Sequence, residues 1–265
     1  MARDERTEGR NATTEELERS LAGASAEFLA GALENPRFRA SFFVLLLRNR
    51  RTPESCLRDL AKRREWTRRY ETKRLLAMHG NTPPVVARTF LPHLFWRDLA
   101  AVADDLRIHP TVRRHGEALL RVRVAEMSLG ERISLARKAT RGLISALTHS
   151  AESAVVEALL GNPRWVEGDA VRLARSEGTP PPALERLARH PTWSRRQAVR
   201  LALCRNPATP PAAGLALLRG MHAPDLRRLA RGGGAPRWIE IAAARALSDG
   251  RTGGGRGDPG GSPSW

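Results

Sequence analysis

At 265 residues, with 41% hydrophobic residues, the chain can bury the core of one large domain or two ordinary ones. The longest apolar run, residues 42–47, is far shorter than the roughly 20 residues of a membrane-spanning helix, and Cys56 and Cys204 form no Cys-x-x-Cys pair. A membrane span, a disulfide framework and a sulfur-ligated metal site are therefore excluded.

The formal net charge of +17 is unevenly distributed, since residues 1–34 sum to −4, residues 35–127 to +11 and residues 128–265 to +10. A positive field of this size attracts polyanions. Only three of the 45 basic residues are lysine, however, and GC-rich coding produces the same bias. The charge thus leaves both a binding role and a coding bias open.

The amino terminus mixes arginine with acidic residues and has no apolar segment of the kind a secretory signal needs. We therefore expect a cytoplasmic protein with no membrane association. Residues 1–13 are expected to be disordered, and a first helical block is expected over residues 14–127.

Self-similarity organises the chain from residue 35 onward. The pair Thr-Pro begins at Thr52, Thr82, Thr179 and Thr209, and each of the first three threonines is followed by a tryptophan at position i+14, with a local period of 30. Residues 35–103 also align without a gap on residues 162–230, an offset of 127, with 22 identities in 69 positions. These periods indicate tandem duplication of a block of helical pairs.

Each repeat unit is expected to contain two helices. Thr52 is placed to cap the first helix, with Pro53 at the first helical position. Leu57 and Leu60 fall at helical spacing on its buried face, and Trp66 begins the second helix. Two short amphipathic helices cannot enclose a core, so successive pairs must stack. The sequence therefore predicts an all-α fold, an α-solenoid of stacked antiparallel helical pairs, tandemly duplicated.

The second helical block is expected over residues 128–247, continuous with the first. Residues 106–151 are helical in pattern but lack the Thr-Pro and tryptophan markers, so they are expected to connect the two blocks. Residues 248–265 are rich in glycine and have no apolar periodicity, which predicts a disordered tail.

Three short stretches carry a resemblance to a known family: residues 187–191 (LARHP), 199–202 (VRLA) and 206–211 (NPATPP). They resemble the leucine-rich repeat variant and the broader HEAT-like class of bacterial α-solenoids, most clearly over residues 179–219. The resemblance implies stacked helical pairs. This chain departs from the class in its longer period of 30 and in lacking the cysteine cluster that holds an iron–sulfur centre in some members. The fold alone, and no functional residue, is carried over.

Basic residues recur at matching positions of the two copies, and these are the candidate contacts to a polyanion or partner. They are Arg68, Arg69 and Lys73 in the first copy and Arg195, Arg196 and Arg200 in the second. Residues 69 and 73, like 196 and 200, are four apart and share one side of a helix. If the second helices line the concave surface, they form a basic stripe suited to phosphates. The alternative is a solvated helix face, partly neutralised by Glu65 and Glu71.

The repeated tryptophans have two interpretations, a platform for stacking bases or a packing element between repeats. Their fixed position relative to a helix start favours packing. We therefore expect Trp66 and Trp193 to be largely buried at equivalent sites.

No metal-ligand spacing of histidines and no phosphate-binding glycine loop is present, and the adjacent acids Asp104 and Asp105 do not share a helix face. The sequence therefore predicts no enzyme, no cofactor, and no catalytic or metal-binding residue. The leading hypothesis is a helical-repeat scaffold that mediates protein–protein interaction. The alternative is a nucleic-acid-binding HEAT-like protein. That resemblance extends to alkylpurine DNA glycosylases, although no residue here matches their catalytic groups.

Overall fold

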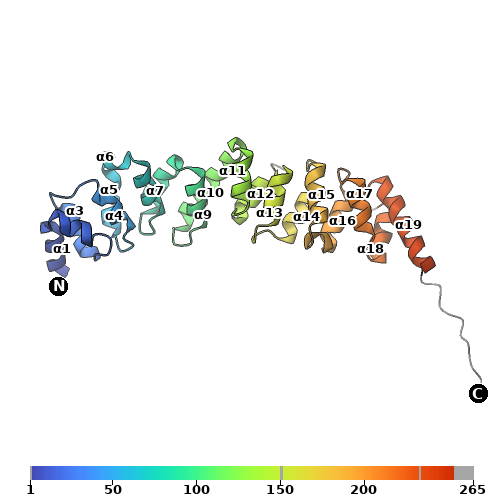
Figure 1. Cartoon of the computed structure of the whole chain (residues 1–265), viewed down its shortest axis with the longest axis horizontal. Coiled ribbons are helices and arrows are strands. Elements are labelled where there is room, and N and C mark those ends of the chain that lie inside the picture. Colours follow the sequence, from blue (N-terminus) through green and yellow to red (C-terminus); the bar gives the residue numbers. More distant parts are fainter. Residues whose placement is uncertain (1, 150–151, 233, 254–265) are drawn as a thin grey trace, which may run out of the picture. The chain divides into compact units, whose positions relative to one another are not determined.

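The computed structural model describes residues 2–149, 152–232 and 234–253, and every regular element in these ranges is a helix (Figure 1). The all-α prediction is confirmed. The chain divides into two compact units, residues 1–127 and 128–265, and each is described by itself. None of the described helices combines the length and apolarity needed to cross a lipid bilayer.

The helices of the first unit are α1 (Ala2–Asn11), α2 (Thr14–Ser20), α3 (Ala26–Glu34), α4 (Phe42–Arg48), α5 (Glu54–Lys62), α6 (Arg64–Thr67), α7 (Tyr70–Met78), α8 (Pro84–Phe90), α9 (Trp96–Asp104) and α10 (Pro110–Arg123), with 3₁₀ segments η1 (Leu91–His93) and η2 (Val124–Glu126). The helices of the second unit are α11 (Leu129–Ala136), α12 (Arg141–His149), α13 (Ser153–Leu160), α14 (Glu167–Arg175), α15 (Pro181–Arg189), α16 (Gln197–Arg205), α17 (Pro211–Leu218), α18 (Ala223–Ala230) and α19 (Arg237–Gly253), with η3 (Trp193–Arg195) between α15 and α16.

Within each unit the helices alternate between two rows. Row A holds α1, α3, α5, α8 and α10 in the first unit and α11, α13, α15, α17 and α19 in the second. Row B holds α2, α4, α7 and α9 in the first unit and α12, α14, α16 and α18 in the second. Most neighbours within a row pack together, for example α1 on α3, α4 on α7, α13 on α15 and α14 on α16. Each helix therefore packs on helices close to it in sequence, as in repeat proteins.

The helices of the two units correspond over more of the chain than the sequence alignment covers. When the offset of 127 is applied, α5 and α7 coincide with α15 and α16 at both ends. The same offset brings α1 and α2 onto α11 and α12, and α10 onto α19. Residues 106–151 are therefore not a connecting segment, because α10 closes one unit while α11 and α12 open the next.

Both expected disordered ends are helical where the structure describes them. Residues 2–11, placed in the disordered segment 1–13, form α1, which packs closely on α3. The carboxy-terminal helix α19 continues to Gly253, so residues 248–253 of the expected tail are helical. The remainder of that tail, residues 254–265, lies outside the described residues.

The threonines of the Thr-Pro pairs do not cap the following helices, as the sequence suggested. The N-cap residue is the proline in each pair, for example Pro53 before α5, and no side-chain cap is present there. Thr52 is buried and its hydroxyl donates backward to the carbonyls of Leu46 and Asn49, at 2.7 and 2.8 Å. It thereby satisfies carbonyls left open at the end of α4. The proline holds its threonine in an extended conformation, so the pair ends one helix before the next begins.

Four buried asparagines bind each repeat to the one before it: Asn35, Asn49, Asn162 and Asn206. The amide of Asn162 donates to the carbonyls of Ala136 and Ala139, at 2.7 and 3.1 Å. The amide of Asn35 makes the equivalent bonds to Gly9 and Ala12, which occupy the matching positions of the first unit. Buried amides of this kind are costly to leave unpaired, so the asparagines fix the spacing of the repeats.

The tryptophans are less buried than expected. Trp66 lies in α6 and Trp193 in η3, so both precede the second helix of their repeat rather than begin it. Each is half-buried. The ring of Trp66 lies 5.7 Å from that of Phe38 and 5.3 Å from that of Phe43, which supports the packing interpretation. Trp165, at the position matching Phe38, is the tryptophan that is buried.

Candidate binding surface

The starts of the row B helices are tied together by aspartates at the third helical position. The residue that opens one row B helix donates to an aspartate in the next, at the same sequence separation of 28 each time. The pairs are Tyr70 with Asp98, Arg141 with Asp169, and Gln197 with Asp225. The two bonds of the Gln197 amide to Asp225 are 3.0 and 2.8 Å long. The starts of α7 and α9, of α12 and α14, and of α16 and α18 are thus held side by side.

We define an N-terminal edge by the N-cap residues of five row B helices, α7, α9, α14, α16 and α18. They are Arg69 and Phe95 in the first unit and Val166, Arg196 and His222 in the second. All five side chains are exposed. The same backbone position therefore carries a cation, an aromatic ring, an aliphatic group or an imidazole, depending on the repeat.

The basic residues singled out from the sequence lie at or next to this edge. Arg68 and Arg69 are exposed at the junction of α6 and α7, and Lys73 is half-buried one turn further on. Arg195 and Arg196 occupy the matching junction of η3 and α16 and are also exposed. The structure thus brings the three positions together within each copy, at the start of one row B helix.

Arg200, the sixth candidate, is half-buried and has a structural partner. Its guanidinium donates to the carbonyls of Leu217 and Gly220, the latter at 2.5 Å, at the end of α17. A cation at a helix carboxy terminus is favourable because the carbonyls there carry partial negative charge. Arg200 therefore joins rows A and B, and the exposed cations beside it are Arg195 and Arg196.

Phe95 is a residue that the sequence interpretation missed. Its side chain is 67% exposed, yet its ring is held 4.5 Å from that of Tyr70. The backbone N–H of Phe95 donates to the hydroxyl of Tyr70 at 3.0 Å, and that hydroxyl in turn donates to Asp98. Burial, and then the hydrogen bond to Asp98, raise the pKa of Tyr70. An exposed ring is thus held against Tyr70, the residue that follows Arg69 in the chain.

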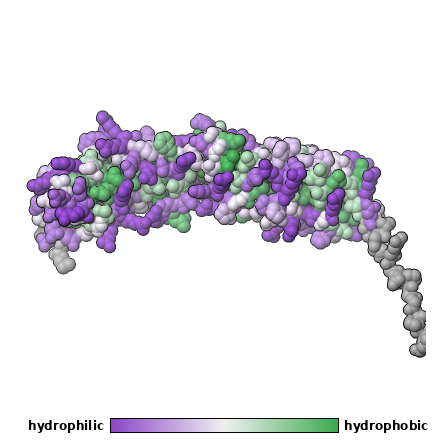
Figure 2. Space-filling model, viewed as in Figure 1, coloured by the Kyte–Doolittle hydropathy of each residue, from purple (hydrophilic) through white to green (hydrophobic). Residues whose placement is uncertain are grey.

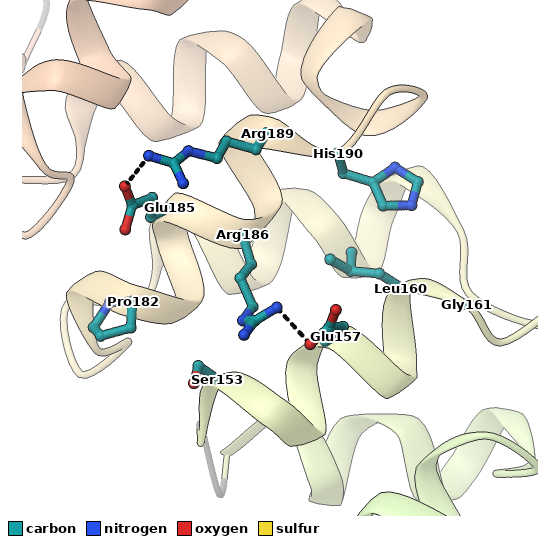
Figure 3. Close-up of a pocket in the computed structure, with 9 residues that line it drawn as sticks. All are labelled: Ser153, Glu157, Leu160, Gly161, Pro182, Glu185, Arg186, Arg189 and His190. Carbon is teal, nitrogen blue, oxygen red and sulfur yellow. Dashed lines mark ion pairs between the residues drawn. The ribbon is translucent and has the colours of Figure 1, made fainter.

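A cavity of about 610 Å³ lies between α13 and α15 in the second unit (Figure 3). Its charged side chains are paired: Arg186 with Glu157 across the two helices, and Arg189 with Glu185 along α15 at 2.6 Å. His190 lines the same cavity, and burial lowers its pKa. Because each guanidinium already has a carboxylate partner, the cavity offers an anion little unpaired positive charge.

Within the described ranges, no group of three or more histidine, cysteine, aspartate or glutamate side chains is placed to hold a metal ion. Cys56 and Cys204 are buried, and burial raises both pKa values, that of Cys204 to about 11. Hydrophilic side chains cover most of the face shown in Figure 2, with smaller hydrophobic areas between them. The exposed surface, rather than a buried centre, is therefore where the chain presents distinctive chemistry.

Fold and surface together describe an all-helical protein of two compact units, each with exposed N-cap residues of varied chemistry. Comparison with models of protein families, with curated proteins and with solved structures finds no match to this chain.

Proposed function

We propose that this protein is a non-enzymatic helical-repeat scaffold, an α-solenoid of the leucine-rich repeat variant and HEAT-like type, that binds a partner protein. Support comes from the two rows of helices within each unit and from the repeat period of 30. The proposal includes a cytoplasmic location, which the free thiols of Cys56 and Cys204 support.

The observation that carries the proposal is the varied chemistry of the N-terminal edge. Two polar side chains inside the repeats, Asn162 and Asp225, recur as Asn35 and Asp98 in the first unit and bond to the neighbouring repeat. The N-cap positions of row B instead differ from repeat to repeat while their backbone is held in place. Exposed aromatic and arginine side chains on a rigid backbone are typical of protein interfaces.

Affinity capture with the full chain tests this proposal. Phe95→Ala combined with Arg69→Glu should weaken capture of a protein partner by about tenfold or more, the scale of an aromatic or arginine hot spot. Leu106→Ala is the matched control, because Leu106 is 82% exposed and lies outside the edge. Capture should persist after nuclease treatment. Equal loss in both variants, or loss on nuclease treatment, would contradict the protein-partner proposal.

Nucleic-acid binding is the second candidate, and the presence of Phe95 and Arg69 at the starts of two neighbouring row B helices favours it. An aromatic ring beside cations is how many proteins hold single strands. Binding of a labelled oligothymidylate should then weaken with salt by about 0.7 log units per neutralised phosphate for each log unit of salt. Phe95→Ala should remove a stacking contribution of about 1–3 kcal/mol. Absence of binding at low salt would reject this candidate.

A further inference from the structure

Three arginines lie in the last turns of successive row B helices of the second unit. Arg175 ends α14, Arg205 ends α16, and Arg228 lies in the last turn of α18. Arg175 and Arg228 are exposed and Arg205 is half-buried. We call these three residues the arginine ladder. It lies at the opposite end of the row B helices from the N-terminal edge.

Backbone geometry places the first two members side by side. The side-chain amide of Asn206 donates to the carbonyls of Ala174 and Ser176, at 2.8 and 3.0 Å. These carbonyls flank Arg175, and Asn206 directly follows Arg205. Arg228 also lies within electrostatic range of Arg205. Burial and then the charges of Arg228 and Arg175 lower the pKa of Arg205, while the charge of Asp225 acts in the opposite direction.

In the part of the chain that the structure describes, the arginines of the ladder are not joined to carboxylates by direct ion pairs. Several other arginines of the second unit are paired with carboxylates, as Arg172 is with Asp169 and Arg186 with Glu157. Among the residues that the structure describes, no ion pair joins a carboxylate to any member of the ladder, and the buried Nε of Arg205 has no hydrogen-bond partner. A helix carboxy terminus offsets only about half a charge. Each step of the ladder therefore stays positive.

We propose that the arginine ladder binds an extended acidic segment of the partner protein, with carboxylates at about every third residue. This inference rests on the proposed function and names the chemistry of the partner. Neighbouring packed helices are about 8–10 Å apart, which matches about three residues of an extended chain. Guanidinium groups bind carboxylates through two parallel hydrogen bonds.

Two features favour an acidic protein segment over a nucleic acid. The sequences of α14, α16 and α18 contain no aromatic residue on which a base would stack. The ladder is also confined to the second unit, because the matching positions of the first unit hold Arg48, Met78 and Ala101. A short segment that spans three helices fits this local site better than a long, uniformly charged strand.

The test uses the full chain and a fluorescent peptide of about 20 residues with glutamate at every third position and glycine or serine between. A second peptide with glutamine in place of glutamate is the control ligand. We expect salt-sensitive binding of the first peptide only. Arg175→Glu and Arg228→Glu, at exposed positions, should each weaken binding about tenfold, the effect of losing one charge-assisted contact.

Arg219→Glu is the matched control variant, because it changes the net charge equally at the end of α17. That end lies beside the start of α16, where Arg200 contacts Gly220, and so away from Arg205. Binding by Arg219→Glu should equal that of the unchanged protein. Arg205→Gln, with helicity checked by circular dichroism, tests the half-buried member without reversing its charge and should also weaken binding.

Three outcomes would overturn the inference: no binding of the glutamate peptide, an equal loss in Arg219→Glu, or tighter binding of an oligothymidylate through the same arginines. The first outcome is distinguishable from failure of the proposed function. A protein partner still captured through Phe95 and Arg69 would leave that function standing while removing the acidic segment from the ladder.

Discussion

At the scale of the residue, the Thr-Pro threonines offer a comparison between two buried hydroxyls. Thr209 donates to the carbonyl of Leu203 at 2.6 Å, whereas the hydroxyl of Thr82 is buried without a hydrogen-bond partner. Thr209→Val should therefore lower the free energy of unfolding by about 1–2 kcal/mol, while Thr82→Val should be neutral or stabilising. Thermal and urea unfolding of both variants would measure the difference. Equal losses of unfolding free energy in the two variants would show that the hydrogen bond of Thr209 does not stabilise the fold.

His79 gives a pH-dependent prediction at the same scale. Its Nε2 donates to the carbonyl of Asn49 at 3.0 Å, and its Nδ1 accepts the N–H of Asn81 at 3.2 Å, an arrangement that requires the neutral ring. Burial lowers the pKa of His79 from 6.5. Because the unfolded chain then binds the proton more readily, the stability that this residue contributes is present above pH 6.5 and is lost as the pH falls below it.

The second unit supplies the substitution that tests this effect. Asn206 occupies the position that matches His79 and makes comparable bonds to the preceding repeat without titrating. His79→Asn should therefore fold normally at pH 7.5 and lose less stability than the unchanged protein on acidification to pH 5. Melting temperatures across this range would report it. An identical acid response in the two proteins would be incompatible with the account.

At the scale of the element, α1 and α3 approach closely because a glycine in each helix lies against the backbone of the other. A Cβ atom added to Gly31 would lie 1.9 Å from the carbonyl oxygen of Arg6, and one added to Gly9 would lie 2.2 Å from that of Phe28. The matching positions in the second unit, 136 and 158, are alanines, so α11 and α13 do not share this glycine contact.

Gly31→Ala should consequently displace α1 and expose its amides. Hydrogen exchange over residues 2–11 should become faster. The added Cβ atom would meet backbone atoms of α1, and these cannot move aside as a flexible side chain can. Gly130→Ala in α11 is the control, since a Cβ there meets nothing within 4 Å. That change should be neutral or stabilise the helix by up to about 1 kcal/mol. Unchanged exchange in Gly31→Ala would refute the close contact.

At the scale of the whole molecule, each unit contains its own set of stacked helices. The packed neighbours of α14, for example, are α12, α15 and α16, all within residues 128–265. Repeat proteins are stabilised by contacts between neighbouring repeats. A fragment of residues 128–265 should therefore be helical by circular dichroism and should melt cooperatively without the first unit. A fragment that stays unfolded would show that the units depend on each other.

The all-helical fold, the repeat period of 30 residues and the offset of 127 between the two similar segments could be read from the sequence alone. These features are local, because helical spacing of residues such as Leu184 and Leu187 appears within a few turns. The same is true of part of the candidate surface. Arg68, Arg69, Arg195 and Arg196 recur at matching positions of the two copies, and the structure finds all four exposed.

Only the tertiary structure decided where the polar side chains bind. A threonine such as Thr52 can cap the helix that follows it or donate to a carbonyl of the helix before it. The packing of the repeat decides that it donates to the carbonyl of Leu46. Arg200 aligns with Lys73 in the sequence, but in the structure its guanidinium donates to a carbonyl at the end of α17. The arginine ladder was missed because it joins neighbouring repeats of one copy instead of matching positions of two. Its three arginines are each one repeat apart in the sequence, and only the packing of the repeats brings them close together.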